Sequence, residues 1–463
     1  MHAYTRLVRH AMVPAMDLLR GTRTAMRIKE LEESQWWSSE RHHESQAAAL
    51  QALVRYAFER VPYYRRLVAE LELRPEDITT PEDLCKLPLL TKDIIHENLP
   101  DLLADDYPRR QLRSSWTGGT TGSRMHFYTT RDNQLSWALP RWVRSMGMQG
   151  FTIGDPHVSI SQMIARRKPF LERLTHSFSN RFQRVTRLDS MDVTEENLEG
   201  MVKAIERAAP CTLAGYPSSL AMLAQFIKDS GRRPPRIVAS MVGGEQLLPH
   251  QRAIMQEMFG NEPYLRYGSN ELLEAAAECP AREGLHISVE DFIVEVVNEH
   301  DQPVPDGQEG RLVFTNLRSY GMPFIRYAIG DIGSQKQSQC SCGRTLPLLD
   351  PIVARTIDYL YSRDGRRIAP MQLDMSPVIE RGITQFRIVQ RDYDHVSVVL
   401  VPRAGDGQPG DPAVIAQSTE RILKSYLGEG LAVSVRFADR IEMNISGKRL
   451  AVMSQIPGVS NMQ

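Results

Sequence analysis

Short apolar segments that alternate with helix-forming segments are the feature that most constrains the fold of this chain. Residues 237–242 form a β-type run that leads directly into Gly243-Gly244, and Pro249 then opens a helix. Residues 194–209 and 217–228 carry apolar residues at three- and four-residue spacing, as helices do. Repeated strand–loop–helix units predict an α/β fold, with mainly parallel sheets wrapped by helices. In such sheets, ligands bind at the carboxyl ends of the strands, where these loops lie.

Two other patterns flank this α/β region. The first hundred residues predict helices, as in 48–61, where Pro62 ends the apolar periodicity. Near residue 300, alternating apolar residues and a turn-rich stretch predict a β meander. From about Asp358, extended runs, a helix and a last strand form an α+β module large enough to fold alone. We therefore predict a large domain over 1–357, with a helical extension over about 1–100, and a small C-terminal domain over 358–463.

Charge and cysteine content exclude several classes of protein. The chain has 56 Lys and Arg against 56 Asp and Glu, so it has no whole-chain attraction for nucleic acid, and we expect no nucleic-acid partner. Five cysteines in 463 residues do not form a disulfide framework, and this number favours a reducing compartment, the cytoplasm. No apolar stretch approaches the roughly 20 residues of a membrane helix. Residues 1–27 predict an amphipathic docking helix, with reversible membrane association as the alternative.

The segment 114–123 (SSWTGGTTGS) has the composition of an anion-binding loop. Hydroxyl groups interleaved with glycines let a backbone turn tightly and direct N–H and O–H donors at one anion, as a triphosphate requires. No lysine follows the glycines, so the loop is not that of a P-loop NTPase. A flexible turn without function is the alternative. The candidate phosphate-binding residues are Thr117, Gly118, Gly119, Thr120, Thr121 and Gly122.

Five further motifs follow this loop in order along the chain: residues 243–245 (GGE), 267–271 (YGSNE), 326–331 (RYAIGD), 355–358 (RTID) and 446–448 (SGK). The series resembles the adenylate-forming enzymes, the superfamily of acyl-CoA synthetases, peptide-synthetase adenylation domains and luciferases. Residues 61–65 (VPYYR) and 87–92 (LPLLTK) resemble the phenylacetate–CoA ligase family within it. The N-terminal extension and residues 33–36 (ESQW) resemble the branch of that family associated with capsular polysaccharide biosynthesis. The likeness spans about residues 30–455.

The resemblance implies a role for each motif in binding ATP. The loop Thr117–Gly122 would hold the β- and γ-phosphates, and Glu271 would bind the Mg²⁺ that bridges them. Lys448 would stabilise charge that develops on the carboxylate and phosphate in the transition state. Taken alone, Glu271, Asp331 and Lys448 are ordinary helix-end, turn and loop residues, so these roles depend on the order of the motifs. The base and ribose would be bound by Gly243, Gly244, Glu245, Tyr267, Gly268, Ser269, Asn270, Asp331 and Arg355.

Four of the remaining chemically distinctive residues have the composition of a metal site. Cys279, His286, Cys340 and Cys342 make a complete tetrahedral ligand set for Zn²⁺ within residues 279–342, and many relatives look alike here. Four protein ligands leave no open position, so this zinc would be structural. A redox pair at Cys340 and Cys342, or four unrelated residues, are the alternatives. The other two cysteines, Cys85 and Cys211, are predicted to be buried as small hydrophobic residues.

The resemblance implies an ATP-dependent acid ligase. A small carboxylic acid would attack the α-phosphate to give an acyl-adenylate and pyrophosphate, and a thiol, coenzyme A first of all, would then displace AMP. The small domain would be mobile and rotate about a hinge near Asp358 between the two steps. The alternatives are transfer to an amine, a sugar hydroxyl or a carrier protein without coenzyme A, or a non-catalytic nucleotide-binding homologue. The sequence does not specify which acid is used. It is compatible with a homodimer.

Overall fold

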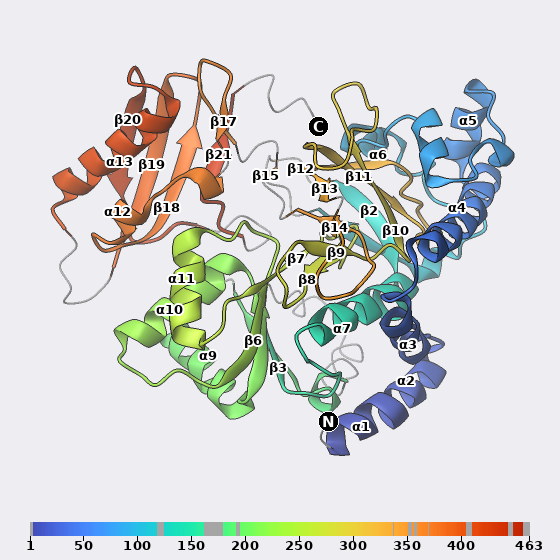
Figure 1. Cartoon of the computed structure of the whole chain (residues 1–463), viewed down its shortest axis with the longest axis horizontal. Helices are drawn as coiled ribbons and strands as arrows, with labels where there is room; N and C mark the ends of the chain where they lie inside the picture. Colours follow the sequence, from blue (N-terminus) through green and yellow to red (C-terminus); the bar gives the residue numbers. More distant parts are fainter. Residues whose placement is uncertain are drawn as a thin grey trace. The chain divides into compact units, whose positions relative to one another are not determined.

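The computed structural model describes residues 3–117, 125–161, 179–190, 195–336, 338–350, 354–355, 359–368, 370–403, 410–442 and 448–456 (Figure 1). The chain forms two compact units, each built from separate stretches of sequence. Unit 1 consists of Met1–Asp155, Ser179–Arg184 and Tyr264–Ile352. Unit 2 consists of Pro156–Phe178, Val185–Pro263 and Val353–Gln463. The predicted small domain over 358–463 is thus part of unit 2, and its separate mobility stays a prediction.

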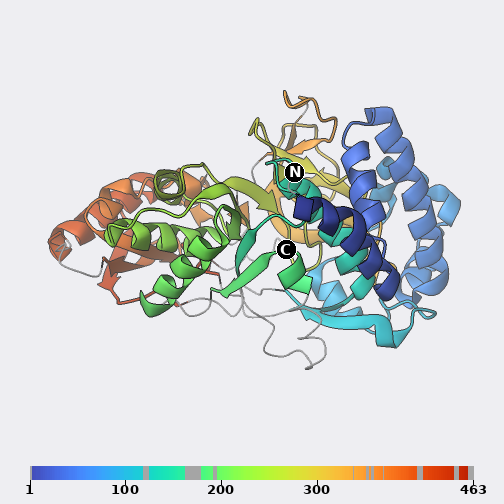
Figure 2. The same ribbon diagram turned by 90° about the horizontal axis from the view of Figure 1, so that it is seen from below.

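Helices dominate the first hundred residues of unit 1, as predicted, and they gather on one side of this unit (Figures 1 and 2). Proline and hydroxyl residues set several of their starts: Ser38 accepts a hydrogen bond from the Arg41 N–H group before α4, and Pro62 is the first residue of α5. The helices are α1(Ala3–Leu7), the π-helical turn η1(Val8–Met12), α2(Val13–Arg20), α3(Thr24–Ser34), α4(Ser39–Arg60), α5(Pro62–Glu70), α6(Lys92–Asn98) and, later, α7(Leu139–Gly147).

The N-terminal helix is amphipathic, as predicted. Val8 and Val13 pack with Ile28, Val143 and Ile153, so one face docks on unit 1. Leu18 and Leu19, near the end of α2, are 88% and 86% exposed. Within the described ranges, no helix is both long enough and apolar enough to cross a membrane.

The strands of unit 1 are antiparallel. One hairpin pairs β1(Leu112–Trp116) with β2(His126–Thr130). The predicted β meander near residue 300 is confirmed as β10(Phe292–Val297), β11(Gly310–Asn316) and β12(Tyr327–Gly333), which pair in sequence order. A further set of strands has the spatial order β13(Gln335–Lys336), β14(Leu348–Leu349), β9(Leu285–Ile287), β8(Ala276–Glu278) and β7(Tyr264–Tyr267).

A network of buried charges lies in unit 1 beside its apolar core. Asp291 is fully buried and accepts hydrogen bonds from Arg27 at 2.6 Å, Arg141 at 2.6 Å and Arg318 at 3.0 Å. Burial by itself would raise the pKa of Asp291, but the three guanidinium groups outweigh it and lower the pKa below its ordinary range. Because Arg27 lies in α3 and Arg141 in α7, this carboxylate fastens two helices to the loop that precedes β10.

The prediction that Cys85 is buried is wrong. Cys85 is exposed, and its thiol donates a hydrogen bond to the Glu82 carbonyl. The segment Pro81–Lys86 is a 3₁₀ helix with three residues per turn. Leu84 and Leu87 therefore face the core together, and Cys85 between them faces away. Cys211, in contrast, is buried as predicted.

Unit 2 contains the predicted strand–loop–helix alternation. Its strands run in the order β6(Ile237–Val242), β5(Cys211–Gly215), β3(His157–Ser161) and β4(Val185–Asp189), and all three pairings are parallel. The helices are α9(Glu195–Ala208), α10(Pro217–Asp229) and α11(Pro249–Phe259). The predicted α/β class is confirmed, with parallel pairing concentrated in this part of the chain. Thr194, the first residue of the segment 194–209 predicted to be helical, lies outside the described residues.

The C-terminal part of unit 2 is an α+β module, as predicted. Its sheet has the order β20(Ala432–Phe437), β19(His395–Pro402), β18(Ile383–Gln390) and β21(Val452–Ser454). Leu248, just before α11, packs in the same apolar cluster as Ile388, Leu400 and Leu423. The module also contains β16(Leu360–Tyr361), β17(Arg367–Ile368), α12(Ser376–Ile379) and α13(Pro412–Leu427), and the short strand β15(Ala354–Arg355) precedes it.

Candidate active site and metal cluster

The β1–β2 hairpin holds both ends of the predicted phosphate-binding loop. The Thr117 N–H group donates to the Met125 carbonyl at 3.0 Å, and the Met125 N–H group donates to Thr117 Oγ1 at 3.0 Å. Between them, Gly118, Gly119, Thr120, Thr121 and Gly122 lie outside the described residues. The structure therefore gives the frame of this loop: two antiparallel strands closed by a reciprocal pair of hydrogen bonds at Thr117.

The loop 267–271 is anchored beside this hairpin. The Asn270 side-chain amide donates to the Trp116 carbonyl at 2.8 Å, immediately before Thr117. Gly268 is required here because a Cβ atom at this position would lie 1.6 Å from the Leu273 carbonyl oxygen. The Ser269 hydroxyl accepts the Leu272 N–H group at 3.1 Å and stabilises the turn. The two motifs, 150 residues apart in sequence, thus meet in unit 1.

Strand β12 orients two of the predicted site residues. The Tyr327 hydroxyl donates to Glu271 Oε1 at 2.8 Å, and Tyr327 itself is fully buried. Four residues further along the strand, buried Asp331 accepts the Tyr267 hydroxyl at 2.6 Å. The Tyr267 ring packs on Phe314 with a centroid distance of 5.8 Å. Thr117, Tyr267, Glu271 and Asp331 are therefore gathered in one unit, with Tyr327 as a supporting residue that the motifs did not single out.

Unit 2 brings together a second group of predicted residues. Gly243, Gly244 and Glu245 directly follow β6, and Lys448 lies beside them: a Cβ atom at Gly244 would be 3.5 Å from Lys448 Cε. Glu245 Oε1 accepts the Arg449 N–H group at 2.7 Å. Arg355 lies in β15, and its side chain lies outside the described part of the chain, as do Ser446 and Gly447.

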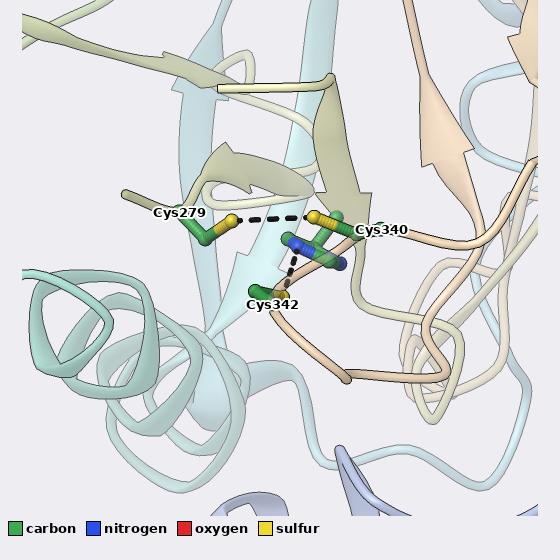
Figure 3. Close-up of side chains that lie close together, drawn as sticks. Cys279, Cys340 and Cys342 are labelled. Carbon is green, nitrogen blue, oxygen red and sulfur yellow. Dashed lines mark hydrogen bonds between the residues drawn. The ribbon is translucent and has the colours of Figure 1, made fainter. Parts of the chain in front are cut away.

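The four predicted zinc ligands lie together in unit 1 (Figure 3). One ligand atom from each of Cys279, His286, Cys340 and Cys342 lies within 4.8 Å of all the others. The Cys279 and Cys340 Sγ atoms are 3.5 Å apart, and Cys342 Sγ is 3.4 Å from His286 Nε2. A tetrahedral zinc ion with Zn–S bonds of about 2.3 Å holds its sulfur ligands about 4 Å apart. The donor set therefore fits this ion in chemistry and in size.

The loop that carries Cys340 and Cys342 also binds the segment between α3 and α4. Arg344 Nε donates to Gln35 Oε1 at 2.7 Å, and the Thr345 N–H group donates to the Gln35 carbonyl at 3.2 Å. The Arg344 guanidinium lies over the Trp36 ring, 4.8 Å from its centroid. The loop that carries two cysteines of this Cys/His cluster therefore contacts the N-terminal extension, a contact that sequence spacing did not indicate.

Comparison with known proteins identifies relatives in the same family that the motifs resembled. The phenylacetate–coenzyme A ligase of Thermus thermophilus is 29% identical over 356 residues, which cover 75% of this chain and 77% of that protein. The predicted resemblance to the phenylacetate–CoA ligase family is confirmed. Protein CapK of Staphylococcus aureus is 22% identical over 403 residues, 85% of each chain, so the likeness to the capsule-associated relatives also holds. No family model matches the chain.

A solved structure supports the fold. A crystal structure of 2-hydroxyisobutyryl-CoA ligase in the postadenylation state matches with a TM-score of 0.73 at 20% identity, over 90% of both chains. The phenylacetate–CoA ligase relative described here therefore has the mixed α/β fold of adenylate-forming ligases.

Proposed function

We propose that this chain is an ATP-dependent acid–CoA ligase. It activates a carboxylic acid as an acyl-adenylate with release of pyrophosphate, and coenzyme A then takes the acyl group with release of AMP. The observation that carries the proposal is the pair of hydrogen bonds Tyr267–Asp331 and Tyr327–Glu271, in a chain similar along most of its length to phenylacetate–CoA ligases.

Unit 1 supplies the groups that bind the nucleotide. Thr117 begins the loop assigned to the β- and γ-phosphates, and Asp331, oriented by Tyr267, is assigned to the ribose hydroxyls. Glu271 offers carboxylate oxygens, the ligands that Mg²⁺ prefers, and the Tyr327 hydroxyl fixes one of them. Mg²⁺, when bound, neutralises charge on the phosphates. Tyr327 thus limits the rotation of Glu271 and orders the carboxylate before the ion arrives.

Unit 2 supplies the proposed catalytic lysine. In the first half-reaction, an acid oxygen bonds to the α-phosphorus while the bond from that phosphorus to the bridging oxygen of pyrophosphate breaks. Negative charge develops on the phosphate oxygens in this step, and the Lys448 ammonium stabilises it. In the second half-reaction, a thiol sulfur bonds to the acyl carbon and AMP leaves.

We further propose that Cys279, His286, Cys340 and Cys342 hold a structural Zn²⁺. The expected result is one zinc ion per chain by elemental analysis of the purified protein. Cys342→Ser should lose this zinc, whereas Cys85→Ser, at an exposed thiol outside the cluster, should keep it. A wild-type protein that contains no zinc after expression with zinc present would contradict the assignment.

A pyrophosphate-release screen of carboxylic acids, beginning with phenylacetate, tests the main proposal. One acid should release pyrophosphate and give a trapped adenylate by mass spectrometry, and coenzyme A should convert that adenylate to a thioester. None of the five cysteines is in a disulfide bond, and this observation together with the use of coenzyme A leads us to place the reaction in the cytoplasm. A homodimer is a further prediction, and light scattering of the purified protein would test it.

The similarity to CapK favours a second candidate, in which the same adenylate passes to an amine, a sugar hydroxyl or a carrier protein during capsular polysaccharide synthesis. The screen separates the two, because an acylated product that forms without coenzyme A would support the second candidate. No pyrophosphate release with any acid would instead favour a non-catalytic nucleotide-binding protein.

A further inference from the structure

The turn 243–245 and the segment around Lys448 meet within unit 2, although 204 residues separate Glu245 from Arg449. The parallel register places Gly215 of β5 opposite Val242 of β6, so the segments after both strands leave the sheet side by side. After β5 the chain begins α10 at Pro217, and after β6 it reaches Glu245. This topology brings the Glu245 side chain to the N-terminus of α10.

The Glu245 carboxylate bridges two backbone segments. Its Oε2 atom accepts the N–H group of Ser218, the second residue of α10, at 3.0 Å. First-turn N–H groups have no partner inside their helix, and the helix dipole favours a negative charge there. Its Oε1 atom accepts the N–H group of Arg449 at 2.7 Å. One carboxylate thus ties the residue next to Lys448 to the end of a core helix.

Lys448 packs against the same turn. Gly244 has a φ of +83°, and a Cβ atom there would lie 2.9 Å from the Tyr216 ring and 3.5 Å from Lys448 Cε. The lysine stem therefore lies over a position that only glycine leaves free. Burial raises the pKa of Glu245, while the Ser218 and Arg449 hydrogen bonds and the positive charge of Lys448 oppose that rise.

Burial of Arg449 opposes the docking of the Lys448 segment. Its Nε and Nη1 atoms are buried without a hydrogen-bond partner in the part of the chain that the structure describes. A buried donor without a partner costs on the order of 1–3 kcal/mol, an amount comparable to what the hydrogen bonds to Glu245 contribute. The hydrogen bonds to Glu245 therefore offset this cost.

We propose that Glu245 is the positioning residue that holds Lys448 in place for the first half-reaction. This inference rests on the proposed function, in which Lys448 stabilises the adenylation transition state. The family resemblance assigns Glu245 to adenine, but both carboxylate oxygens here accept hydrogen bonds from the chain's own backbone. The two roles differ in consequence: an adenine contact serves both half-reactions, whereas a clamp on Lys448 serves the first alone.

Separate assays of the two half-reactions distinguish these roles. Glu245→Gln places an amide donor against one of the two N–H donors and should lower the rate of acid-dependent ATP–pyrophosphate exchange about 10- to 100-fold, the loss of a charged hydrogen bond. The KM for ATP and the rate of thioester formation from the synthetic acyl-adenylate and coenzyme A should stay within about threefold of wild type. Lys448→Ala should have the same pattern, and adding Glu245→Gln to it should cause no further loss.

A matched substitution controls for general effects. Glu257→Gln makes the same chemical change in unit 2, at a solvent-facing pair with Lys228, and should leave both half-reactions unchanged. The intact second half-reaction of Glu245→Gln shows that this variant is folded. A raised KM for ATP, an equal loss in both half-reactions, or an additive loss in the double variant would overturn the proposal.

A labelling experiment tests the clamp without any enzymatic activity. Acetylation of Lys448 by an N-hydroxysuccinimide ester, followed by mass spectrometry without substrates, should be several times faster in Glu245→Gln than in wild type. Exposed Lys228 in the same samples should react at equal rates and serves as the internal reference. Unchanged Lys448 labelling would refute the clamp. Faster labelling in a protein that activates no acid would support the clamp and refute the proposed function.

Discussion

Two carboxylates removed from water, Asp291 in unit 1 and Glu245 in unit 2, are stabilised in opposite ways. Asp291 is fully buried and bound by three guanidinium groups, which lower its pKa despite burial. Glu245 is partly buried and bound by two backbone N–H groups, and burial raises its pKa. The first arrangement is a permanent part of a core, because any release would leave several charges unpaired. The second can open at small cost, because only neutral N–H groups and one nearby lysine are involved.

The largest expected effect is a loss of stability when the charge of Asp291 is removed from its buried network. Asp291→Asn removes the charge that compensates Arg27, Arg141 and Arg318, and should lower the free energy of unfolding of unit 1 by about 3–5 kcal/mol. Chemical denaturation monitors the loss. Asp105→Asn removes a half-exposed pair with Arg65 and should cost at most about 1 kcal/mol. Equal losses in the two variants would show that Asp291 is not a structural centre.

The next largest effect is expected at Lys448, the residue that Glu245 is proposed to hold in place. Lys448→Ala should lower the rate of ATP–pyrophosphate exchange about 10²- to 10³-fold, the loss expected when a charge-stabilising group is removed from a transition state. The unfolding midpoint should hardly change. Lys228→Ala removes an exposed lysine of the same unit and should keep full exchange. Unchanged exchange in Lys448→Ala would remove this residue from the mechanism.

A smaller effect is expected at Glu271, a third carboxylate, which accepts a hydrogen bond from the Tyr327 hydroxyl. Tyr327→Phe removes its hydroxyl donor and should raise the Mg²⁺ concentration needed for half-maximal exchange about tenfold. Tyr56→Phe is the matched change in unit 1, at a hydroxyl that contacts exposed Asp106, and should leave this concentration unaltered. A Tyr327→Phe enzyme with normal Mg²⁺ dependence would show that this hydrogen bond does not order Glu271.

The pH dependence of stability should separate the two carboxylates by sign. The folded pKa of Asp291 lies below the unfolded value of about 3.9, so its contribution is complete above that pH and is lost as pH falls further. The stability difference between wild type and Asp291→Asn should therefore be constant from pH 7 to 5 and shrink below about pH 4, by at most about 1.4 kcal/mol per pH unit.

Glu245 should behave in the opposite direction. Its folded pKa is raised, so ionisation costs stability, and wild type should gain relative to Glu245→Gln as pH falls from 7 towards about 4.3. Chemical denaturation of wild type, Asp291→Asn and Glu245→Gln at several pH values gives the slope of each stability difference against pH. Slopes of the same sign would contradict the distinction between the two sites.

Local sequence signals predicted much of this molecule. The order of six motifs predicted the fold and the gathering of Tyr267, Glu271 and Asp331, because the two motifs that carry these residues lie in or directly follow strands β7 and β12. The cysteine cluster was predicted from its residue types together with the likeness of relatives at this place, since few other combinations hold a tetrahedral metal ion.

Contacts across long sequence separations were not predictable in this way. Arg27 and Asp291 are 264 residues apart, and an isolated arginine in a helix carries no sign of its distant partner. Tyr327 resembles any aromatic residue of a strand until the fold places Glu271 beside its hydroxyl. The exposure of Cys85 depends on a 3₁₀ turn, which changes the facing of a single residue within an apolar stretch.

The discontinuity of unit 1 has a consequence for synthesis of the chain on the ribosome. Arg141 emerges 150 residues before its partner Asp291, and the four parallel strands β3, β4, β5 and β6 of unit 2 are made in between. At about 5–20 residues per second, Arg141 of α7 waits roughly 8–30 s for its counter-charge, and Arg27 of α3, 264 residues before Asp291, waits roughly 13–53 s. During this interval the helical N-terminal part is an incomplete core, whereas the parallel sheet already has all its strands. The segment inserted into the middle of the chain is therefore the one that can fold first.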